Sequence, residues 1–333
     1  MLPAIALSVL IVLLSPAFAW SDTDSVYPAN PSVKANSIFI AGRGVARFDL
    51  VSGGMFWSAL QQELLYEPLV AGSRVVAAGN GGLFALDSES GSILWQHGFP
   101  TDLFSPVLAG GRLIVTAGNG TVYAVAIETG DILWEKKSAQ GWLYPPAAEG
   151  GLLITGGQGR VVLALDAKTG ALRWQREVAQ ELVYSPLATG SGGVIVTTFS
   201  GDVTLLKSDD GRELWRTRFD TPSIFPSLVG RYLLLSGLDG VLRALDPARG
   251  ELVWQQTLPA RLTTPVSGSD GLLTATVDGG EVFVLDFDSG AILKNYRLGA
   301  EAVGGALLAD NRVVVFVERR NEHTPVPVYF DVY

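Results

Sequence analysis

Two carboxylates, Asp87 and Glu89, lie close together in the stretch ALDSESGSILWQ, which ends beside Trp95. Acidic side chains at such short spacing can work as a general acid and base, or can share a hard cation such as Ca²⁺ if several more oxygens converge. Nearly the same stretch recurs as GTVYAVAIETGDILWE, GRVVLALDAKTGALRWQ and GVLRALDPARGELVWQ. Because the acidic residues recur once per copy, ahead of a glycine, we interpret them as turn residues and predict no catalytic residue among them.

Other site chemistries are limited by composition. The 333 residues include no Cys, which excludes a disulfide framework, a thiolate metal site and a cysteine nucleophile. The two histidines, His97 and His323, are too few for a His-rich metal cage, and they complete no Ser-His-Asp set. A net charge of -9 without a run of Lys or Arg disfavours a nucleic-acid partner. We therefore predict neither a metal site nor nucleic-acid binding.

The first nineteen residues, MLPAIALSVLIVLLSPAFA, have the features of a secretory signal. An apolar core precedes the small-x-small site Ala17-Phe18-Ala19, although the segment has no Lys or Arg. We predict a signal peptide over residues 1–19 that is cleaved after Ala19; retention as an uncleaved anchor is the alternative. No Cys follows the cut, so a lipoprotein signal is excluded. The mature protein is predicted to be periplasmic or secreted, without a membrane span.

The residues that position these side chains belong to an internal repeat. Its tryptophans recur at intervals of 37 to 41 residues, and a Gly stands four residues before each position from Trp57 onward. Five copies carry an Asp four residues before that Gly, and a Pro follows each Trp by 11 or 12 residues. Proline suits the first residue of a strand, and Asp followed by Gly suits a tight turn. A period near forty with four short strands per copy is typical of a β-propeller.

Counting the copies gives eight units. Seven have a complete outer hairpin with the turn Gly, whereas the last ends with a third strand, VPVYFDVY. The residues around Trp20 have the right spacing to supply its missing fourth strand, which would remove an unpaired edge. We therefore predict an all-β fold: an eight-bladed β-propeller of four-stranded antiparallel blades, with the last blade closed by the N-terminal strand. Residues 20–333 are predicted to form this single domain.

The pattern Ala-x-Asp-x-x-x-Gly-x-x-x-Trp, as in Ala85 to Trp95, resembles the repeat of the PQQ-like (quinoprotein-type) eight-bladed β-propeller family. The resemblance implies that each Trp packs between adjacent blades while its indole N–H reaches the neighbouring backbone. The docking tryptophans are then Trp20, Trp57, Trp95, Trp134, Trp174, Trp215 and Trp254. Lys294 stands at the next position, so we expect the junction after the seventh blade to be the least well docked.

This family has an enzymatic and a non-enzymatic branch. The resemblance implies pyrroloquinoline quinone and Ca²⁺ in the dehydrogenases, which have long connections between blades and commonly a vicinal Cys pair. Here the connections are short, Cys is absent, and the predicted inner strands carry one carboxylate, Glu149. The layout is closest to the BamB outer-membrane assembly branch, although the lipid-anchor Cys of that branch is missing. We predict a non-enzymatic scaffold without cofactor; the alternative is a quinone-dependent oxidoreductase or a quinone-binding relative.

An arc of aromatic residues is the candidate interaction surface. Most of these residues stand two before the Pro that opens a strand, where a propeller gathers its blade connections on one face. The candidates are Tyr66, Phe104, Trp142, Tyr144, Tyr184 and Phe225. An exposed patch of this kind suits a protein partner, including envelope or outer-membrane assembly proteins, bound by a monomer. Two alternatives stay open: the rings cover blade junctions only, or they bind a small ligand or glycan.

Overall fold

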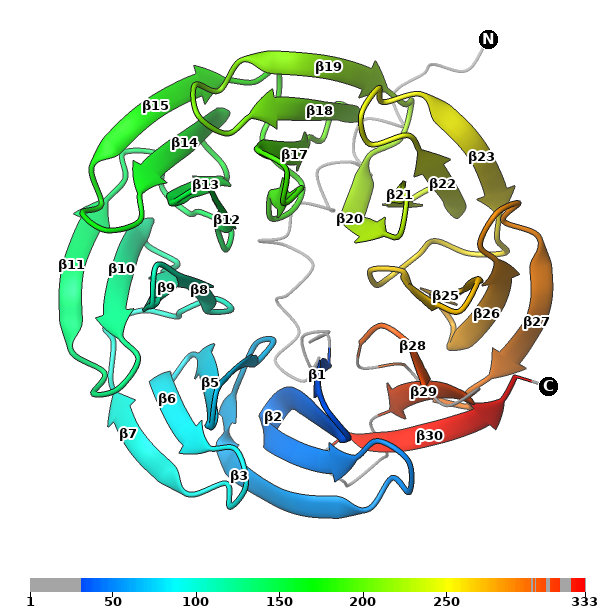
Figure 1. Ribbon diagram of the computed structural model, residues 1–333, viewed down its shortest axis with the longest axis horizontal. Coiled ribbons are helices and arrows are strands. Elements are labelled where there is room, and N and C mark those ends of the chain that lie inside the picture. The colour runs from blue at the N-terminus through cyan, green and yellow to red at the C-terminus, as the bar shows by residue number, and fades with distance from the viewer. Residues whose placement is uncertain (1–30, 301, 303, 310–311, 318–324, 333) are drawn as a thin grey trace, which may run out of the picture.

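The computed structural model describes residues 31–300, 302, 304–309, 312–317 and 325–332. These residues form strands and no helix, and the strands are arranged as eight blades around a central axis (Figure 1). The predicted eight-bladed β-propeller is thereby confirmed. No helix in the described part of the chain is long and apolar enough to cross a membrane.

Each blade is an antiparallel sheet whose strands follow the chain from the axis outward. The first three blades contain β1 (Ser32–Lys34), β2 (Ser37–Asp49) and β3 (Met55–Leu64); β4 (Leu69–Ala71), β5 (Arg74–Gly79), β6 (Gly82–Asp87) and β7 (Ile93–His97); and β8 (Val107–Ala109), β9 (Arg112–Thr116), β10 (Thr121–Ala126) and β11 (Ile132–Lys137). The fourth and fifth blades contain β12 (Ala147–Glu149), β13 (Leu152–Gly156), β14 (Val161–Asp166) and β15 (Leu172–Glu177); and β16 (Leu187–Ala188), β17 (Gly193–Thr197), β18 (Asp202–Lys207) and β19 (Glu213–Arg218). The last three contain β20 (Ser223–Val229), β21 (Tyr232–Gly237), β22 (Val241–Leu245) and β23 (Leu252–Thr257); β24 (Ser267–Ser269), β25 (Leu272–Val277), β26 (Glu281–Asp286) and β27 (Ile292–Arg297); and β28 (Leu307–Ala309), β29 (Arg312–Val317) and β30 (Val326–Asp331).

The long strand β2 supplies both middle strands of the first blade. It runs through a tight turn at Gly44, where φ is +88° and a Cβ would lie 2.7 Å from the carbonyl oxygen of Ala59. The backbone N–H of Leu50 donates to the carbonyl of Asn36 at 3.0 Å, so the two ends of β2 lie side by side. The first blade therefore has the same four layers as its neighbours.

The eighth blade consists of β28, β29 and β30 within the described residues. The predicted fourth strand around Trp20, and the predicted signal peptide, lie outside those residues. The closure of this blade by the N-terminal strand and the division of the chain at Ala19 therefore stay predictions.

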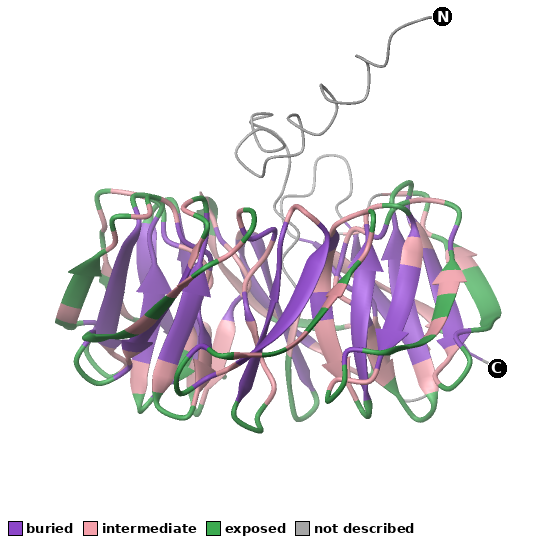
Figure 2. Cartoon of the chain, turned by 90° about the horizontal axis from the view of Figure 1, so that it is seen from above, coloured by how far each residue is buried: buried purple, intermediate pink, exposed green. Residues whose placement is uncertain are grey.

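Burial follows the position of a strand within its blade. The third strand β10 is buried over five consecutive residues, because both of its faces pack against neighbouring blades. In the outermost strand β11 only Trp134 is partly buried, and the other residues are exposed. Figure 2 shows the same distribution around the ring, with buried residues inside and exposed residues on the outer strands and turns. The apolar runs of the repeat therefore mark middle strands.

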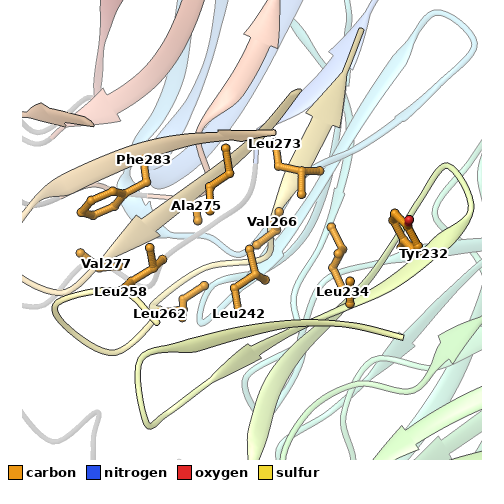
Figure 3. Packing of buried hydrophobic residues seen from close by; sticks show 12 residues of the cluster. Tyr232, Leu234, Leu242, Leu258, Leu262, Val266, Leu273, Ala275, Val277 and Phe283 are labelled. Atoms are coloured by element: carbon orange, nitrogen blue, oxygen red, sulfur yellow. The ribbon is translucent and has the colours of Figure 1, made fainter. Parts of the chain in front are cut away.

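The hydrophobic core is divided into eight clusters, one at each junction between adjacent blades. Figure 3 shows the cluster between the sixth and seventh blades, where Leu234 and Leu242 face Leu273 and Phe283. The junction between the eighth and first blades has its own cluster, in which the rings of Phe48 and Phe316 lie 5.4 Å apart. Each blade is thus stabilised mainly by its two neighbours.

Candidate functional site

The connections between blades share one face of the ring with the turns between second and third strands. The backbone N–H of Asn80 donates to the carbonyl of Leu64 at 3.3 Å, and in the next blade Gly118 donates to Asp102 at 2.9 Å. We call this side of the molecule the connection face. The opposite face carries the Asp-Gly turns.

Three successive connections present an aromatic residue directly after a buried leucine. Leu65, Leu103 and Leu143 pair with the second strand of their blades in isolated bridges and are fully buried. The following residue, an aromatic in all three cases, donates its backbone N–H to the same strand. Successive residues of an extended chain point to opposite sides, so a buried leucine directs the next ring outward. Local pairing thereby repeats the same presentation from blade to blade.

The six predicted aromatic residues form one continuous row of rings, which we call the aromatic row. Consecutive ring centroids are separated by 5.4 Å from Tyr66 to Phe104, 5.4 Å from Phe104 to Trp142 and 4.5 Å from Trp142 to Tyr144. The row continues over 6.1 Å from Tyr144 to Tyr184 and 4.8 Å from Tyr184 to Phe225. These are normal distances for tilted and edge-to-face aromatic pairs. Side chains from five connections thus make a single apolar surface.

Tyr144 anchors the row. It is only 6% exposed, and its hydroxyl donates to the backbone carbonyl of Val183 at 3.0 Å, which joins the fourth and fifth blades. Burial raises its pKa far above the usual tyrosine range. The other five rings are partly exposed. Tyr144 therefore covers a blade junction, whereas its neighbours present part of their surface to solvent.

The repeated aspartates serve the turns in which they stand. One carboxylate oxygen of Asp87 accepts the backbone N–H groups of Glu89 and Ser90 at 3.1 and 2.8 Å. Asp166 does the same for its turn, and its second oxygen accepts from Arg173 at 2.6 Å, which lowers its pKa to about 2. Asp49, Asp246 and Asp286 accept equivalent backbone bonds. These contacts account for the aspartates as turn residues.

The docking tryptophans pack on the turn of the following blade. A Cβ on Gly130 would lie 2.7 Å from the ring of Trp95, and the other turn glycines meet their tryptophans at similar distances. Four indoles donate to a backbone carbonyl of that turn at 2.7 to 3.1 Å: Trp57, Trp95, Trp174 and Trp215. The buried indole nitrogens of Trp134 and Trp254 have no partner among the described residues. Trp20 lies outside the described part of the chain.

Tyrosines dock the two junctions of the eighth blade. Next to Lys294, the ring of Tyr296 stacks on Phe330 with centroids 4.6 Å apart, and its hydroxyl donates to the carbonyl of Asp331 at 2.6 Å. This junction, which we expected to be the least well docked, therefore has a ring and a hydrogen bond of its own. At the other junction, the ring of Tyr329 lies against Gly53.

The inner strands do not fit a quinone with Ca²⁺. Glu149, the one carboxylate on the described inner strands, accepts the backbone N–H groups of Gly190 and Gly192 at 2.9 and 2.7 Å. Across the described ranges, no three His, Asp or Glu side chains are grouped so that they could hold a metal ion. His97 lies 4.9 Å from the ring of Phe99, and His323 is outside those ranges. Among the described side chains, the several carboxylates that such a cation usually takes as ligands are not brought together.

A second apolar surface was missed by the sequence reasoning. The one or two apolar residues before each docking position are 40% to 56% exposed and run around the outer strands as an apolar belt. Its members are Met55, Phe56, Ile93, Leu94, Ile132, Leu133, Leu172, Leu214, Leu252, Val253, Ile292 and Leu293. Repeated pairs such as IL before Trp were the available signal, but alternation alone did not show that these side chains face outward.

Known proteins resemble this chain in sequence and in fold. A family described as outer membrane protein assembly factor BamB matches residues 25–103, 41–183, 97–229 and 238–324. The crystal structure of the computationally designed Ika8 protein is similar with a TM-score of 0.79 and 15% identity, over 92% of this chain and 96% of that chain. The crystal structure of BamB from Moraxella catarrhalis is similar with a TM-score of 0.73 and 19% identity, over 91% and 94%. A search of curated proteins found no match.

Proposed function

Because the chain belongs to the family of outer membrane protein assembly factor BamB, we propose that it is a non-enzymatic, extracytoplasmic scaffold that binds protein partners in envelope or outer-membrane protein assembly. The observation that carries this proposal is the aromatic row. Rings from five successive blade junctions follow one another in a continuous arc, and five of the six keep part of their surface exposed. Partly exposed Tyr, Trp and Phe residues are enriched where proteins bind one another.

The scaffold is tested by crosslinking and co-purification of the exported protein from its own envelope. The double variant Phe104→Ala/Tyr184→Ala removes two row members without disturbing the hydrogen bond of Tyr144. The matched control is Ile93→Ala/Leu133→Ala, which removes apolar side chains from the belt on the outer strands. We expect the row variant to lose partner recovery and the control to retain it. Equal recovery by both variants would rule out the row as the binding surface.

The non-enzymatic part of the proposal is tested separately. Purified protein is mixed with pyrroloquinoline quinone and Ca²⁺, and dye-linked alcohol oxidation is followed. No stoichiometric spectral change and no turnover are expected, because Glu149 is occupied by backbone N–H groups and no further carboxylates converge. Stoichiometric binding with turnover would establish the oxidoreductase instead.

The proposed location rests on the N-terminal segment. We infer that residues 1–19 are removed during export and that residues 20–333 form the mature, monomeric protein. Mass spectrometry of the protein recovered from the envelope fraction is expected to give an N-terminus at Trp20. An intact Met1 in a membrane-bound protein would instead establish an uncleaved anchor.

A further inference from the structure

Carboxylates stand on the same connections as the aromatic row. The connections over residues 60–67, 98–105, 138–145, 178–185 and 219–225 contain no Lys or Arg. They contain five acidic residues: Glu63 and four that we call the acidic fringe, which are Glu67, Asp102, Glu181 and Asp220. Asp102 and Phe104 flank the buried Leu103, so they point to the same side of the chain.

Two fringe carboxylates act on rings that belong to other connections. Burial is the main cause of the raised pKa values of Tyr144 and Tyr184. The charge of Glu181 raises the pKa of Tyr144 further, and the charge of Glu67 raises the pKa of Tyr184 further. Glu67 and Tyr184 come from connections three blades apart.

Part of the fringe is not neutralised within the described structure. Asp102, Glu181 and Asp220 form no salt bridge among the described residues. Beyond the end of the row, by contrast, two carboxylates at the connection face of the seventh blade are paired. Asp278 pairs with Arg261 at 3.1 Å and Glu281 with Arg297 at 2.6 Å. The connections that carry the rings thus hold carboxylates without a salt bridge among the described residues.

Basic groups on the connection face stand in other positions. Arg43 and Arg160 lie in turns between second and third strands, and Lys137 and Arg218 end outer strands. Lys137 is held by the carbonyl of Asn119 at 2.5 Å. The connections that carry the row hold carboxylates and no Lys or Arg, which leaves an excess of negative charge on the same segments as the rings.

The spacing of the rings suits an extended chain. Neighbouring centroids are 4.5 to 6.1 Å apart, and an extended strand repeats its side chains on one face about every 6.6 Å. The row follows the blades around the ring (Figure 1), so a straight strand can lie along only a few neighbouring rings, such as those of Phe104, Trp142 and Tyr144. There, alternate apolar side chains would contact the rings, and the intervening side chains would face away from them. Lys or Arg at those intervening positions would meet carboxylates.

Resting on the proposed function, we propose that the segment bound by the aromatic row is an extended stretch of a partner protein in which apolar residues alternate with Lys or Arg. Charge complementarity with Asp102, Glu181 and Asp220 then selects such a segment over an acidic one of equal hydrophobicity. The row supplies contact area, and the fringe supplies the selection.

Fluorescence anisotropy with labelled peptides tests this proposal on the full mature protein. The probe is a twelve-residue peptide that alternates Leu or Tyr with Lys; its partners replace every Lys by Glu, or every apolar residue by Ser. We expect the Lys peptide to bind at least about tenfold more tightly than the Glu peptide, with a preference that shrinks at high salt. The Ser peptide should bind weakly because it cannot cover the rings.

The matched variants are Asp102→Asn/Glu181→Gln/Asp220→Asn, which keeps the rings, and Phe104→Ala/Tyr184→Ala, which keeps the charges. The first should lose the Lys-over-Glu preference, and the second should weaken both peptides. Equal binding of the two peptides, no binding of either, or binding of a maltooligosaccharide instead would overturn the inference. In those cases, row-dependent recovery of a partner from the envelope would still support the proposed scaffold, whereas row-independent recovery would remove both.

Discussion

The ring of Tyr329 lies against Gly53, where a Cβ would be 2.6 Å from Cε2 of the tyrosine. In the second to seventh blades the equivalent turn glycine meets a tryptophan from the outermost strand of the preceding blade. Tyr329 stands instead on the third strand β30, paired with Val314, at the position that holds Ala124 in the third blade. The ring of Tyr329, which belongs to the third strand, thus occupies the docking position at the junction between the eighth and first blades.

Replacing Tyr329 by Ala should weaken this junction. Deleting a fully buried aromatic ring costs about 3–5 kcal/mol, and Tyr329 is half-buried, so we expect roughly half of that loss in the free energy of unfolding. Tyr329→Phe keeps the ring and loses only a long 3.3 Å hydrogen bond to the carbonyl of Asp49, so it is the control. Urea unfolding followed by tryptophan fluorescence measures both variants. Identical transitions would show that the ring contributes nothing to closure.

The hydrogen bond of a docking tryptophan can be isolated by comparing two junctions. Trp174 donates to the carbonyl of Ser208 at 2.7 Å, whereas the indole nitrogen of Trp134 has no partner among the described residues. Both Trp→Phe variants lose similar ring area, but only Trp174→Phe loses a hydrogen bond. We expect Trp174→Phe to be the more destabilising by about 1 kcal/mol in urea unfolding. An equal or reversed order would contradict the docking geometry.

Substitution of a turn glycine by alanine is expected to lower the free energy of unfolding, and to lower it most where a ring packs against the glycine. At Gly130, φ is +80° and a Cβ would lie 2.7 Å from the ring of Trp95; at Gly150, φ is +57° and nothing lies within 4 Å. Gly150→Ala should cost about 1–2 kcal/mol from backbone strain alone. Gly130→Ala should cost about 1–3 kcal/mol more, because the ring must move. Thermal unfolding of the two variants gives the comparison, and equal melting temperatures would argue against close packing of Trp95.

Stability should fall in acid as the turn aspartates become protonated. The pKa of Asp166 is lowered to about 2, first by its hydrogen bond with Arg173 and then by Thr169. An unfolded Asp has a pKa of about 3.9, so the folded state favours the charged form above that pH. This stabilisation is present above about pH 4 and is lost as the pH falls toward 2. The pKa values of Asp49, Asp87 and Asp286 are lowered as well, through bonds from their turns.

The variant Asp166→Asn separates this contribution. It keeps an oxygen that can accept the backbone N–H groups of Lys168 and Thr169, but it cannot titrate. Between about pH 5 and pH 2.5 its melting temperature should therefore fall less than that of the natural protein. A parallel pH dependence in both proteins would mean that Asp166 carries no folded-state preference for its charged form.

Much of the architecture could be predicted because it is encoded in repetition. The intervals between tryptophans, with Gly and Pro at constant offsets, predicted eight four-layered units; the structure contains eight blades, of which the eighth has three strands within the described residues. The aromatic row could be predicted in part for the same reason, since a residue at a constant offset in each copy occupies a constant place in each blade. Its continuity from Tyr66 to Phe225 could not, because ring contacts depend on the angle between neighbouring blades.

The places where the repeat breaks were less predictable. Lys294 indicated that the docking ring is missing at this junction. The repeat pattern could not show that Tyr296, two residues further along the same strand, supplies a ring there. The apolar belt was not predicted either, because an apolar pair before a docking Trp is typical of buried residues. Only the position of the outermost strand at the rim shows that these side chains are exposed.

By itself the sequence determined the number of blades, the strand order within them and the turn role of residues such as Asp87, whereas the docking role of residues such as Trp174 was implied by the family resemblance. These follow from local chemistry: a turn needs its acceptor and its glycine wherever it occurs. Only the tertiary structure decided which side chains meet across blades. Tyr329 reaches Gly53 and Tyr184 reaches Phe225 because closing the ring brings distant segments to set angles and distances, which no repeat spacing specifies.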